Sequence, residues 1–426
     1  MTKITIIISI NTSYSYNAIL AYSVIVGIKV SVKSPQKSYT RYIMKKAVMK
    51  RLLPLYSGKF FLSFVLWYST EKLFIRSIGI DNFGISLITI VLLVSCILTE
   101  IPSGIIADRW SRKGSMVLSG LFLGISSLMA GASDSIFMYS AAVVIWGFHD
   151  AFSSGTGTAM IYDALLEEQG HARNFNRALG LYEALGGVAL IISNFLGGWI
   201  GGHSLLLTFN LTTIPIAISM ICHLLYKDAK ISREVADEKL IKHAKNTFKC
   251  VFKSKSLIWL MAVTMMVFCV QKINREAYQL WYIALSAPAI VFGIAGSSVE
   301  GLGGLGGSLV KYLGSKKVNI ALSILLGLAS VVLSLSANLW ITIIAQVLIA
   351  VISGALLFHF IAQIQHQLPS RYRVGSGSVI TAVGRIILMP LIFIFGIISN
   401  QNVFAAGWML VVLSISAVIV QLKLGE

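Results

Sequence analysis

A short basic stretch between two apolar runs decides how the chain folds: Gly104-Ile-Ile-Ala-Asp108-Arg109-Trp-Ser-Arg112-Lys113-Gly114. The run 84–107 leads into it, and the run 115–133 follows it. A helix needs about 20 apolar residues to cross the hydrocarbon core of a membrane. The pattern therefore predicts two membrane helices joined by a cationic loop.

The composition extends this prediction to the whole chain. Of its 426 residues, 56% are hydrophobic and 12% are charged, whereas soluble proteins average about 45–50% apolar and about 25% charged residues. Disorder, collagen-like repeats and a disulfide scaffold are excluded. The apolar runs are continuous rather than short and alternating, which excludes an outer-membrane barrel. We expect an all-α polytopic membrane protein.

Apolar runs separated by polar breaks predict twelve spans in two sets of six. The spans lie near residues 54–77, 84–107, 115–133, 136–162, 178–201 and 204–226, and then near 257–283, 288–312, 318–336, 339–366, 375–399 and 402–422. Residues 51–226 are predicted to form an N-terminal six-helix bundle, and residues 257–426 a C-terminal one. Residues 227–256 are predicted to be a basic cytoplasmic linker between them.

Lys and Arg residues gather on alternate connections between the spans. One side holds basic residues near positions 50–51, 109–113, 173–177, 227–256, 311–317 and 371–373, while the short loops of the other side hold none. Cytoplasmic loops retain such residues, so we expect a multi-pass protein of the inner (cytoplasmic) membrane with both termini in the cytoplasm. The net charge of +18 then reports topology, and no nucleic-acid partner is expected.

Residues 1–50 form an N-terminal extension with three possible interpretations. They are an interfacial segment, an additional span, or a start-site artefact with Met44 or Met49 as the natural beginning. The run 18–30 is short for a span, and no small-residue cleavage site follows it. A thirteenth span would place the N-terminus outside, which favours the other two interpretations.

The stretch from Gly104 to Lys113 resembles the signature loop of the major facilitator superfamily, G-x-x-x-D-R-x-G-R-K, with Ser111 where that family usually has glycine. The resemblance covers roughly residues 50–424. It implies two pseudo-symmetric six-helix bundles, a substrate site between them at the membrane midplane, and alternating access by rocking. A degenerate second copy, residues 307–317, has Lys311 where the first has Asp108.

The resemblance also implies roles for the signature-loop residues. In the family, the aspartate at the position of Asp108 braces the two halves in the outward-facing state, and a loop arginine pairs with an acid that ends helix four. Asp163 is placed to be that acid, and Gly104 is expected to permit close approach of helices. The signature and gating residues are thus Gly104, Asp108, Arg109, Arg112, Lys113 and Asp163.

Two further family patterns are incomplete. The helix-five antiporter pattern keeps its terminal pair, Gly197 and Gly198, but lacks the Gly-Pro. The arginine that exporters often carry in helix four is replaced by Ala151. Both departures weaken the case for an exporter.

Ionisable residues inside spans are costly and therefore count as functional candidates. A carboxylate in a low-dielectric site takes up a proton more readily, which nominates Glu71, Asp150, Glu183, Glu276 and Glu300 for proton coupling. Glu100 is expected to brace the signature loop instead. The substrate-cavity candidates are Trp67, His149, Gln271, Asn274, Arg275, Tyr278, His359, Gln363 and Arg385.

The seventh span is the most polar of the twelve. Its helical spacing places Gln271, Asn274, Arg275 and Tyr278 on one face, and Lys272 and Glu276 on another. So much polarity needs a water-filled cavity or a broken helix. The alternative is that the span ends early and that these residues belong to its periplasmic mouth.

No cofactor or metal is expected, and the chain is not predicted to be an enzyme. The four cysteines are scattered without the spacing of a metal site or disulfide. The run Gly301-Leu-Gly-Gly-Leu-Gly306 fits a dinucleotide fingerprint, but it lies in a predicted span with no preceding strand. A proton gradient is the expected energy source.

The sequence thus predicts a secondary transporter that moves a small organic solute by alternating access. Proton-coupled export of drug- or siderophore-like compounds is the first hypothesis, because the first and seventh spans are rich in aromatic residues. An uptake permease for a polar or anionic nutrient is the second, and Lys272, Arg275 and Arg385 would supply its positive charge. A transport-inactive sensor or lipid-handling relative is the third. We expect a monomer whose partners are its small-molecule substrate and membrane lipids.

Overall fold

The computed structural model describes residues 46–229, 254–303, 306–310, 313–368 and 370–423. Most of the predicted N-terminal extension and of the linker 227–256 lies outside these ranges. Every regular element within them is a helix. The predicted all-α fold is confirmed.

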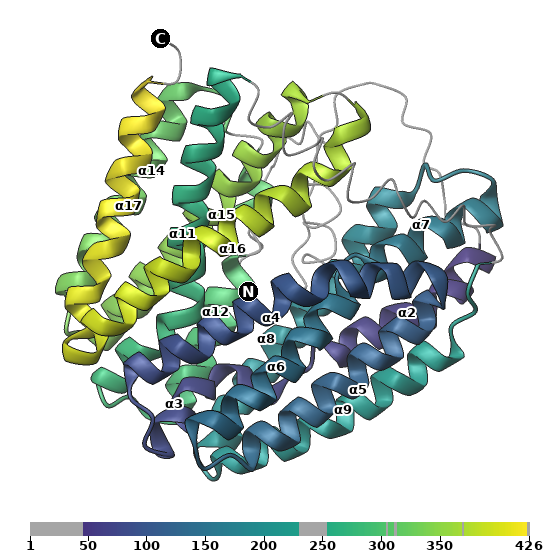
Figure 1. The fold of residues 1–426 in the computed structure, drawn as a ribbon, viewed down its shortest axis with the longest axis horizontal. Coiled ribbons are helices and arrows are strands. Elements are labelled where there is room, and N and C mark those ends of the chain that lie inside the picture. Colours follow the sequence, from purple (N-terminus) through teal and green to yellow (C-terminus); the bar gives the residue numbers. More distant parts are fainter. Residues whose placement is uncertain (1–45, 230–253, 304–305, 311–312, 369, 424–426) are drawn as a thin grey trace, which may run out of the picture.

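The helices follow one another along the chain in two sets (Figure 1). The N-terminal set is α2 (Lys46–Leu62), η1 (Leu66–Ser69), α3 (Glu71–Ser77), α4 (Asn82–Arg109), α5 (Arg112–Gly131), α6 (Ile136–Ser153), α7 (Thr156–Gln169), α8 (Phe175–Gly201) and α9 (Leu205–Leu225). The C-terminal set is α11 (Lys255–Ala284), α12 (Ala289–Gly303), α13 (Gly306–Leu309), α14 (Lys316–Leu335), α15 (Leu339–Gln367), α16 (Ser370–Gln401) and α17 (Val403–Lys423).

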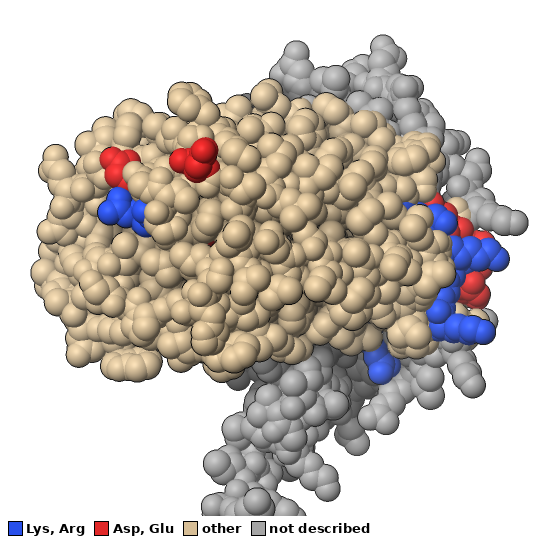
Figure 2. All heavy atoms as spheres, turned by 90° about the horizontal axis from the view of Figure 1, so that it is seen from below, with Lys and Arg blue, Asp and Glu red and all other residues tan. Residues whose placement is uncertain are grey.

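The helices account for twelve membrane-crossing segments. Ten of the described segments are long and apolar enough to cross a membrane. The shorter apolar helix α12 and the composite of α2, η1 and α3 supply the other two. Figure 2 shows one side of the molecule, where a broad surface without Lys, Arg, Asp or Glu separates charged groups at its two ends. Such a surface suits the hydrocarbon core.

The first predicted span, 54–77, is not one continuous helix. The chain leaves the helical conformation at Val65, which is extended, with φ −108° and ψ 109°. The backbone N–H of Leu66 donates instead to Thr212 Oγ1, at 3.1 Å. Gly197 allows this break, because a Cβ there would lie 1.8 Å from the carbonyl oxygen of Leu66.

The fourth predicted span, 136–162, is also interrupted. Helix α6 ends at Ser153, and α7 begins at Thr156 after a turn. Gly155 in that turn has φ +71°, a left-handed conformation that favours glycine. Asp163 lies on α7, after this turn.

A serine of the signature loop caps the helix that follows the loop. Ser111 Oγ accepts a hydrogen bond from the backbone N–H of Gly114 at 2.9 Å, at the start of α5. The same hydroxyl donates to Asp228 at 2.8 Å. A glycine at position 111 could make neither side-chain contact, which gives a physical reason for this departure from the family pattern.

The two halves meet near the end of the molecule opposite the signature loop, which we call the far face; the other end is the signature face. Figure 1 shows the purple-to-teal half and the green-to-yellow half adjoining around α3 and α12. Asn82 Nδ2 of α4 donates to the carbonyl of Ser399 at 2.8 Å. Gly198 lies so close to Gly293 of α12 that a Cβ would be 2.5 Å from its Cα. The far face is therefore closed by direct contact between the halves.

Candidate substrate cavity

A cavity of about 190 Å³ lies between the two halves. Helices α3, α4 and α6 of the N-terminal half and α11, α12 and α16 of the C-terminal half contribute to its wall. The lining includes four acidic and four basic side chains: Glu71, Asp150, Glu276 and Glu300, and Lys72, Lys272, Arg275 and Arg385. Charge at this density inside a membrane protein marks a functional site.

The break in the first span places an ion pair in the cavity wall. Glu71 and Lys72 begin α3, and their charged groups lie 2.8 Å apart. Tyr139 of α6 donates a further hydrogen bond to Glu71 at 3.3 Å. Both charged residues are buried, so each neutralises the other where water is scarce.

A second ion pair joins neighbouring helices of the C-terminal half. Arg275 of α11 and Glu300 of α12 approach to 3.2 Å. The arginine side chain remains half-exposed within the cavity, whereas Glu300 is largely covered. The pair orients the guanidinium and leaves part of it open to a solute.

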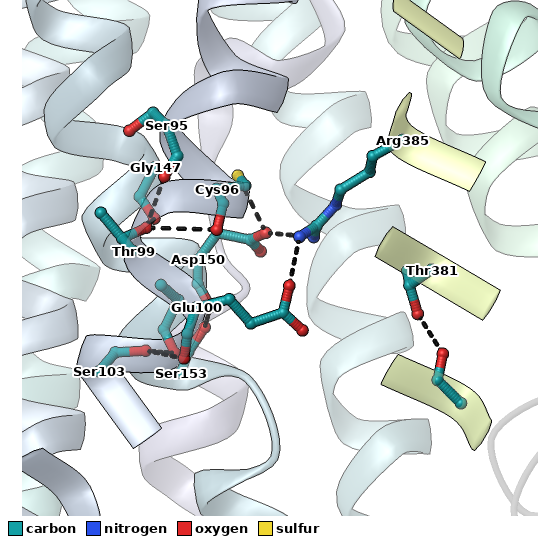
Figure 3. A network of polar contacts seen from close by, with 12 residues as sticks. Ser95, Cys96, Thr99, Glu100, Ser103, Gly147, Asp150, Ser153, Thr381 and Arg385 are labelled. Atoms are coloured by element: carbon teal, nitrogen blue, oxygen red, sulfur yellow. Dashed lines mark hydrogen bonds and ion pairs between the residues drawn. The ribbon is translucent and has the colours of Figure 1, made fainter. Parts of the chain in front are cut away.

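Arg385 of α16 makes an ionic contact across the two halves. Its guanidinium lies 2.9 Å from the carboxylate of Glu100 on α4 and 3.3 Å from that of Asp150 on α6. Figure 3 shows both acids reaching from one half toward the arginine of the other. Cys96 Sγ lies 3.5 Å from Asp150 Oδ2. Two carboxylates thus share one cation, which leaves this cluster one positive charge short of neutrality.

Helix α11 is continuous, so its polar residues are not a frayed mouth of the span. Five of its side chains line the cavity: Lys272, Arg275, Glu276, Tyr278 and Gln279. The cavity-facing set therefore combines residues that were predicted to lie on two different faces. Gln271 and Asn274 turn toward α15 instead, where Asn274 Nδ2 donates to the carbonyl of Gln346 at 3.2 Å.

Gln279 is a second link between the halves. Its side-chain amide donates to the carbonyl of Tyr68 at 2.7 Å. Its oxygen accepts from the backbone N–H of Lys72 at 2.9 Å. The amide thus satisfies polar backbone groups exposed where the first span is broken, which accounts for a buried glutamine at this position.

Aromatic side chains form another part of the wall. Tyr68 and Trp146 stack with ring centroids 5.5 Å apart and 28° between the planes, and both line the cavity with Tyr278. Trp67 lies behind them, contrary to its prediction as a cavity residue. It is buried against Phe209, and its indole N–H donates to Ser127.

Several other predicted residues lie outside the cavity. His359 Nε2 is 3.1 Å from Asn319 Nδ2 of α14 and 2.8 Å from Gln363 Nε2, within the C-terminal half. Glu183 of α8 is 3.4 Å from Lys59 of α2, and its side chain is 57% exposed. These placements remove His359 and Gln363 as cavity candidates and give Glu183 a partner elsewhere. His149 does line the cavity, and its Nδ1 lies 2.8 Å from Ser119 Oγ.

The signature loop is held by contacts within the N-terminal half. Arg112 Nη1 donates to Asp163 of α7 at 2.5 Å, which joins the two residues expected to pair. Lys113 Nζ reaches the carbonyl of Leu224 at 3.4 Å. Asp108 and Arg109 end α4, and their side chains lie outside the described part of the structure.

Gly104 does not make the close helix contact expected of it. A Cβ built at this glycine would meet nothing within 4 Å. The close approach of glycines occurs instead at Gly197 and Gly198.

Sequence patterns missed several residues of the site, among them the charged residues Glu100 and Lys72. Glu100 was assigned to the signature loop, yet its carboxylate contacts Arg385 in the other half. Lys72 was not among the sequence candidates, yet it lines the cavity. Both residues are ionisable and lie within predicted spans, so the cost of a charge in the membrane was the signal available for finding them. Among the described residues, no group of three or more His, Cys, Asp or Glu side chains could hold a metal ion.

Two helical bundles with a charged cavity between them are the architecture of a secondary membrane transporter. The chain belongs to the Major Facilitator Superfamily, whose sequence profile matches residues 52–389. It is therefore a transporter, not an enzyme. No curated protein matches the sequence significantly.

Solved structures of this fold are similar to the chain over almost its whole length. The nucleoside transporter NupG is 15% identical, with a TM-score of 0.69, over 87% of this chain and 98% of that one. A bacterial homologue of the human lysosomal transporter Spinster, inward-facing and occupied, is 14% identical, with a TM-score of 0.70, over 92% and 97%. A D-xylose-proton symporter is 12% identical, with a TM-score of 0.65, over 89% and 98%. At these identities the likeness concerns the fold.

Proposed function

We propose that this protein carries a small polar solute across the inner membrane by alternating access, coupled to the movement of protons. The observation that carries the proposal is the contact of Arg385 with Glu100 and Asp150, because it places titratable groups of one half on a cation of the other. A change of protonation there alters the attraction between the halves that must separate during transport.

The charge of the cavity supports a polar solute. Sites for apolar drugs are lined predominantly by hydrophobic and aromatic side chains, whereas eight charged residues line this one. An apolar solute would remove water from these charges without replacing its hydrogen bonds, and that loss is costly. The geometry thus supports a polar nutrient or metabolite better than a drug-like compound.

The proposed proton site is the pair of acids that shares Arg385. Glu71 and Glu300 each have a cation of their own, Lys72 and Arg275. Glu100 and Asp150 have one cation between them, so neutralising one acid by a proton brings the cluster to charge balance. We assign the proton to this pair, with Asp150 facing the cavity.

The closed far face gives the proposed direction of opening. The distribution of Lys and Arg favours a cytoplasmic signature face, so we propose that the cavity of this conformation opens toward the cytoplasm. Both termini then lie in the cytoplasm, and Arg112 and Asp163 brace the face that rearranges. We propose that the protein acts as a monomer in the lipid bilayer.

Export of amphipathic compounds is the second candidate. The stacked rings of Tyr68 and Trp146 in the cavity wall favour it, because a flat apolar group could pack on them. The export hypothesis from the sequence is thus supported by one observation, the stacked pair of Tyr68 and Trp146. The transport-inactive alternative predicts no flux at all.

A flux assay separates these functions. The full chain is reconstituted in liposomes that contain a pH-sensitive dye, and sugars, nucleosides, amino acids, dipeptides and lipophilic cations are added in turn. A polar solute that moves protons supports the proposal. Proton movement only with lipophilic cations supports export, and the absence of solute-dependent proton movement for every compound contradicts proton-coupled transport.

A further inference from the structure

The charges of the cavity pair off and leave one acid and one base without a partner. Six of the eight form ion pairs: Glu71 with Lys72, Asp150 with Arg385, and Glu300 with Arg275. Within the described residues, Lys272 and Glu276 form no ion pair. Lys272 Nζ lies 6.0 Å from the centre of the Phe268 ring. Glu276 accepts no side-chain hydrogen bond within the described residues, and its attraction to Arg275 and Lys272 acts without direct contact.

Lys272 and Glu276 attract each other, but they do not form an ion pair. They lie one helical turn apart on α11, yet their charged atoms are farther apart than the 4.0 Å of an ion pair. The order with lysine N-terminal to glutamate is also the less favourable one for an i, i+4 pair on a helix. Both side chains are partly buried and line the cavity. Charges in such a place are costly unless a partner arrives.

We infer that the solute is a zwitterion, which supplies both missing partners. Its carboxylate, or an equivalent oxyanion, binds Lys272 Nζ, and its ammonium group binds the carboxylate of Glu276. Four residues of a helix rise about 6 Å, so the solute is short, with its two charges separated by about one helical turn. This inference rests on the proposed transport function and names its substrate class.

The rest of the cavity agrees with a solute of this kind. The volume of about 190 Å³ limits the solute to a small molecule. Trp146 and Tyr278 offer apolar surface for the chain between the two charged groups. A zwitterion adds no net charge, so the proton at Glu100 and Asp150 is the only charge moved in each cycle. Transport driven by this solute is therefore expected to be electrogenic.

Binding is tested on the full chain in lipid nanodiscs, with thermal unfolding as the readout, because a ligand stabilises the folded state that binds it. The probes are the unbranched ω-amino acids from glycine to 6-aminohexanoic acid, together with the amide and the N-acetyl derivative of each. We expect stabilisation by the amino acids that peaks at one chain length. The amide and N-acetyl forms, which each lack one charge, are expected to have no effect.

Substitutions assign each charge to its residue. Lys272→Gln should weaken binding about tenfold or more, since a lost ionic hydrogen bond costs about 1.5–3 kcal/mol, and it should remove the preference for the acid over its amide. Glu276→Gln should weaken binding to the same extent and remove the preference for the free amine over its N-acetyl form. Lys59→Gln and Glu183→Gln, which lie outside the cavity, are the matched controls and should bind as the wild type does. If a single variant does not fold, the exchanged variant Lys272→Glu/Glu276→Lys keeps both charges and should still bind the zwitterion.

Three results would overturn the inference: no stabilisation by any amino acid of the series, equal stabilisation by the amide or N-acetyl forms, or binding unaffected by both glutamine variants. Failure of the proposed function looks different. In that case zwitterions bind and the variants abolish binding, but no solute moves protons in the flux assay. Proton-coupled flux of an uncharged sugar that persists in both variants would retain the function and reject the zwitterion.

Discussion

Arg385 Nη1 on α16 lies 2.9 Å from Glu100 Oε2 on α4, and this ion pair spans the two halves of the transporter. The same guanidinium contacts Asp150. Arg385→Gln removes the cation and leaves two carboxylates facing each other in a poorly solvated place. We expect loss of proton-coupled flux of about a hundredfold or more, because a broken pair of partly buried charges costs about 3 kcal/mol.

Arg385→Lys is the conservative comparison. Lysine keeps the charge but cannot present two donors in a fixed fork to two acids. An intermediate flux is expected, measured in the same liposomes with equal amounts of reconstituted protein. Full activity of Arg385→Gln would show that the contact between the halves is dispensable.

The pair of Glu71 and Lys72 is expected to be structural. Glu71→Gln leaves the buried ammonium of Lys72 without its partner and should lower the free energy of unfolding by about 3–5 kcal/mol. Replacing both, Glu71→Gln/Lys72→Met, should restore much of that loss. Thermal unfolding in detergent measures both variants. A stable single variant that lacks proton coupling would instead make Glu71 the proton site.

Gly198 controls the closure of the far face. A Cβ at this position would lie 2.5 Å from Cα of Gly293, so Gly198→Ala should separate α8 from α12. Gly187→Ala on the same helix meets nothing within 4 Å and is the matched control.

The far-face contact between positions 82 and 399 reports that closure. In a background without native cysteines, Asn82→Cys and Ser399→Cys should cross-link readily, and Gly198→Ala should reduce the cross-linked fraction about tenfold, which corresponds to about 1.4 kcal/mol. Undiminished cross-linking in Gly198→Ala would mean that the glycine contact does not control closure.

The ion pair of Arg112 and Asp163 should stabilise the signature face. Asp163→Asn removes one charge from a pair that is 16% and 14% exposed, at an expected cost of about 1.5–3 kcal/mol. The exchanged variant Arg112→Asp/Asp163→Arg should be more stable than Arg112→Asp alone. Equal stability of those two variants, measured by chemical denaturation, would rule out a direct contribution of the pair.

The architecture could be predicted from the sequence because membrane spans are recognised by their length and hydropathy. The signature loop then named the family. The two interruptions, near Val65 and at Gly155, could not be predicted in the same way. Each depends on a tertiary contact or a single backbone conformation rather than on apolar content. Gly197, for example, accommodates the break in a helix more than a hundred residues earlier.

The sequence predicted many of the charged residues of the site, but it did not predict which of them contact each other. The cost of charge in a membrane nominated Glu71, Asp150, Glu276 and Glu300, which line one cavity, but it also nominated Glu183, which lies elsewhere. Helical periodicity alone could not decide which face of α11 meets the cavity, because both faces carry polar groups. Nor could it show that Glu100 reaches Arg385, since contacts between halves follow from their tertiary arrangement.

The central claim is that Glu100 and Asp150 share the coupling proton, and the most direct test is solute accumulation driven by a pH gradient in liposomes. For Asp150→Asn, we predict that downhill exchange of the solute continues while accumulation against a gradient disappears. Glu100→Gln should show the same separation, and Glu183→Gln should accumulate solute as the wild type does. Accumulation that remains driven by the pH gradient in both Asp150→Asn and Glu100→Gln would contradict the claim.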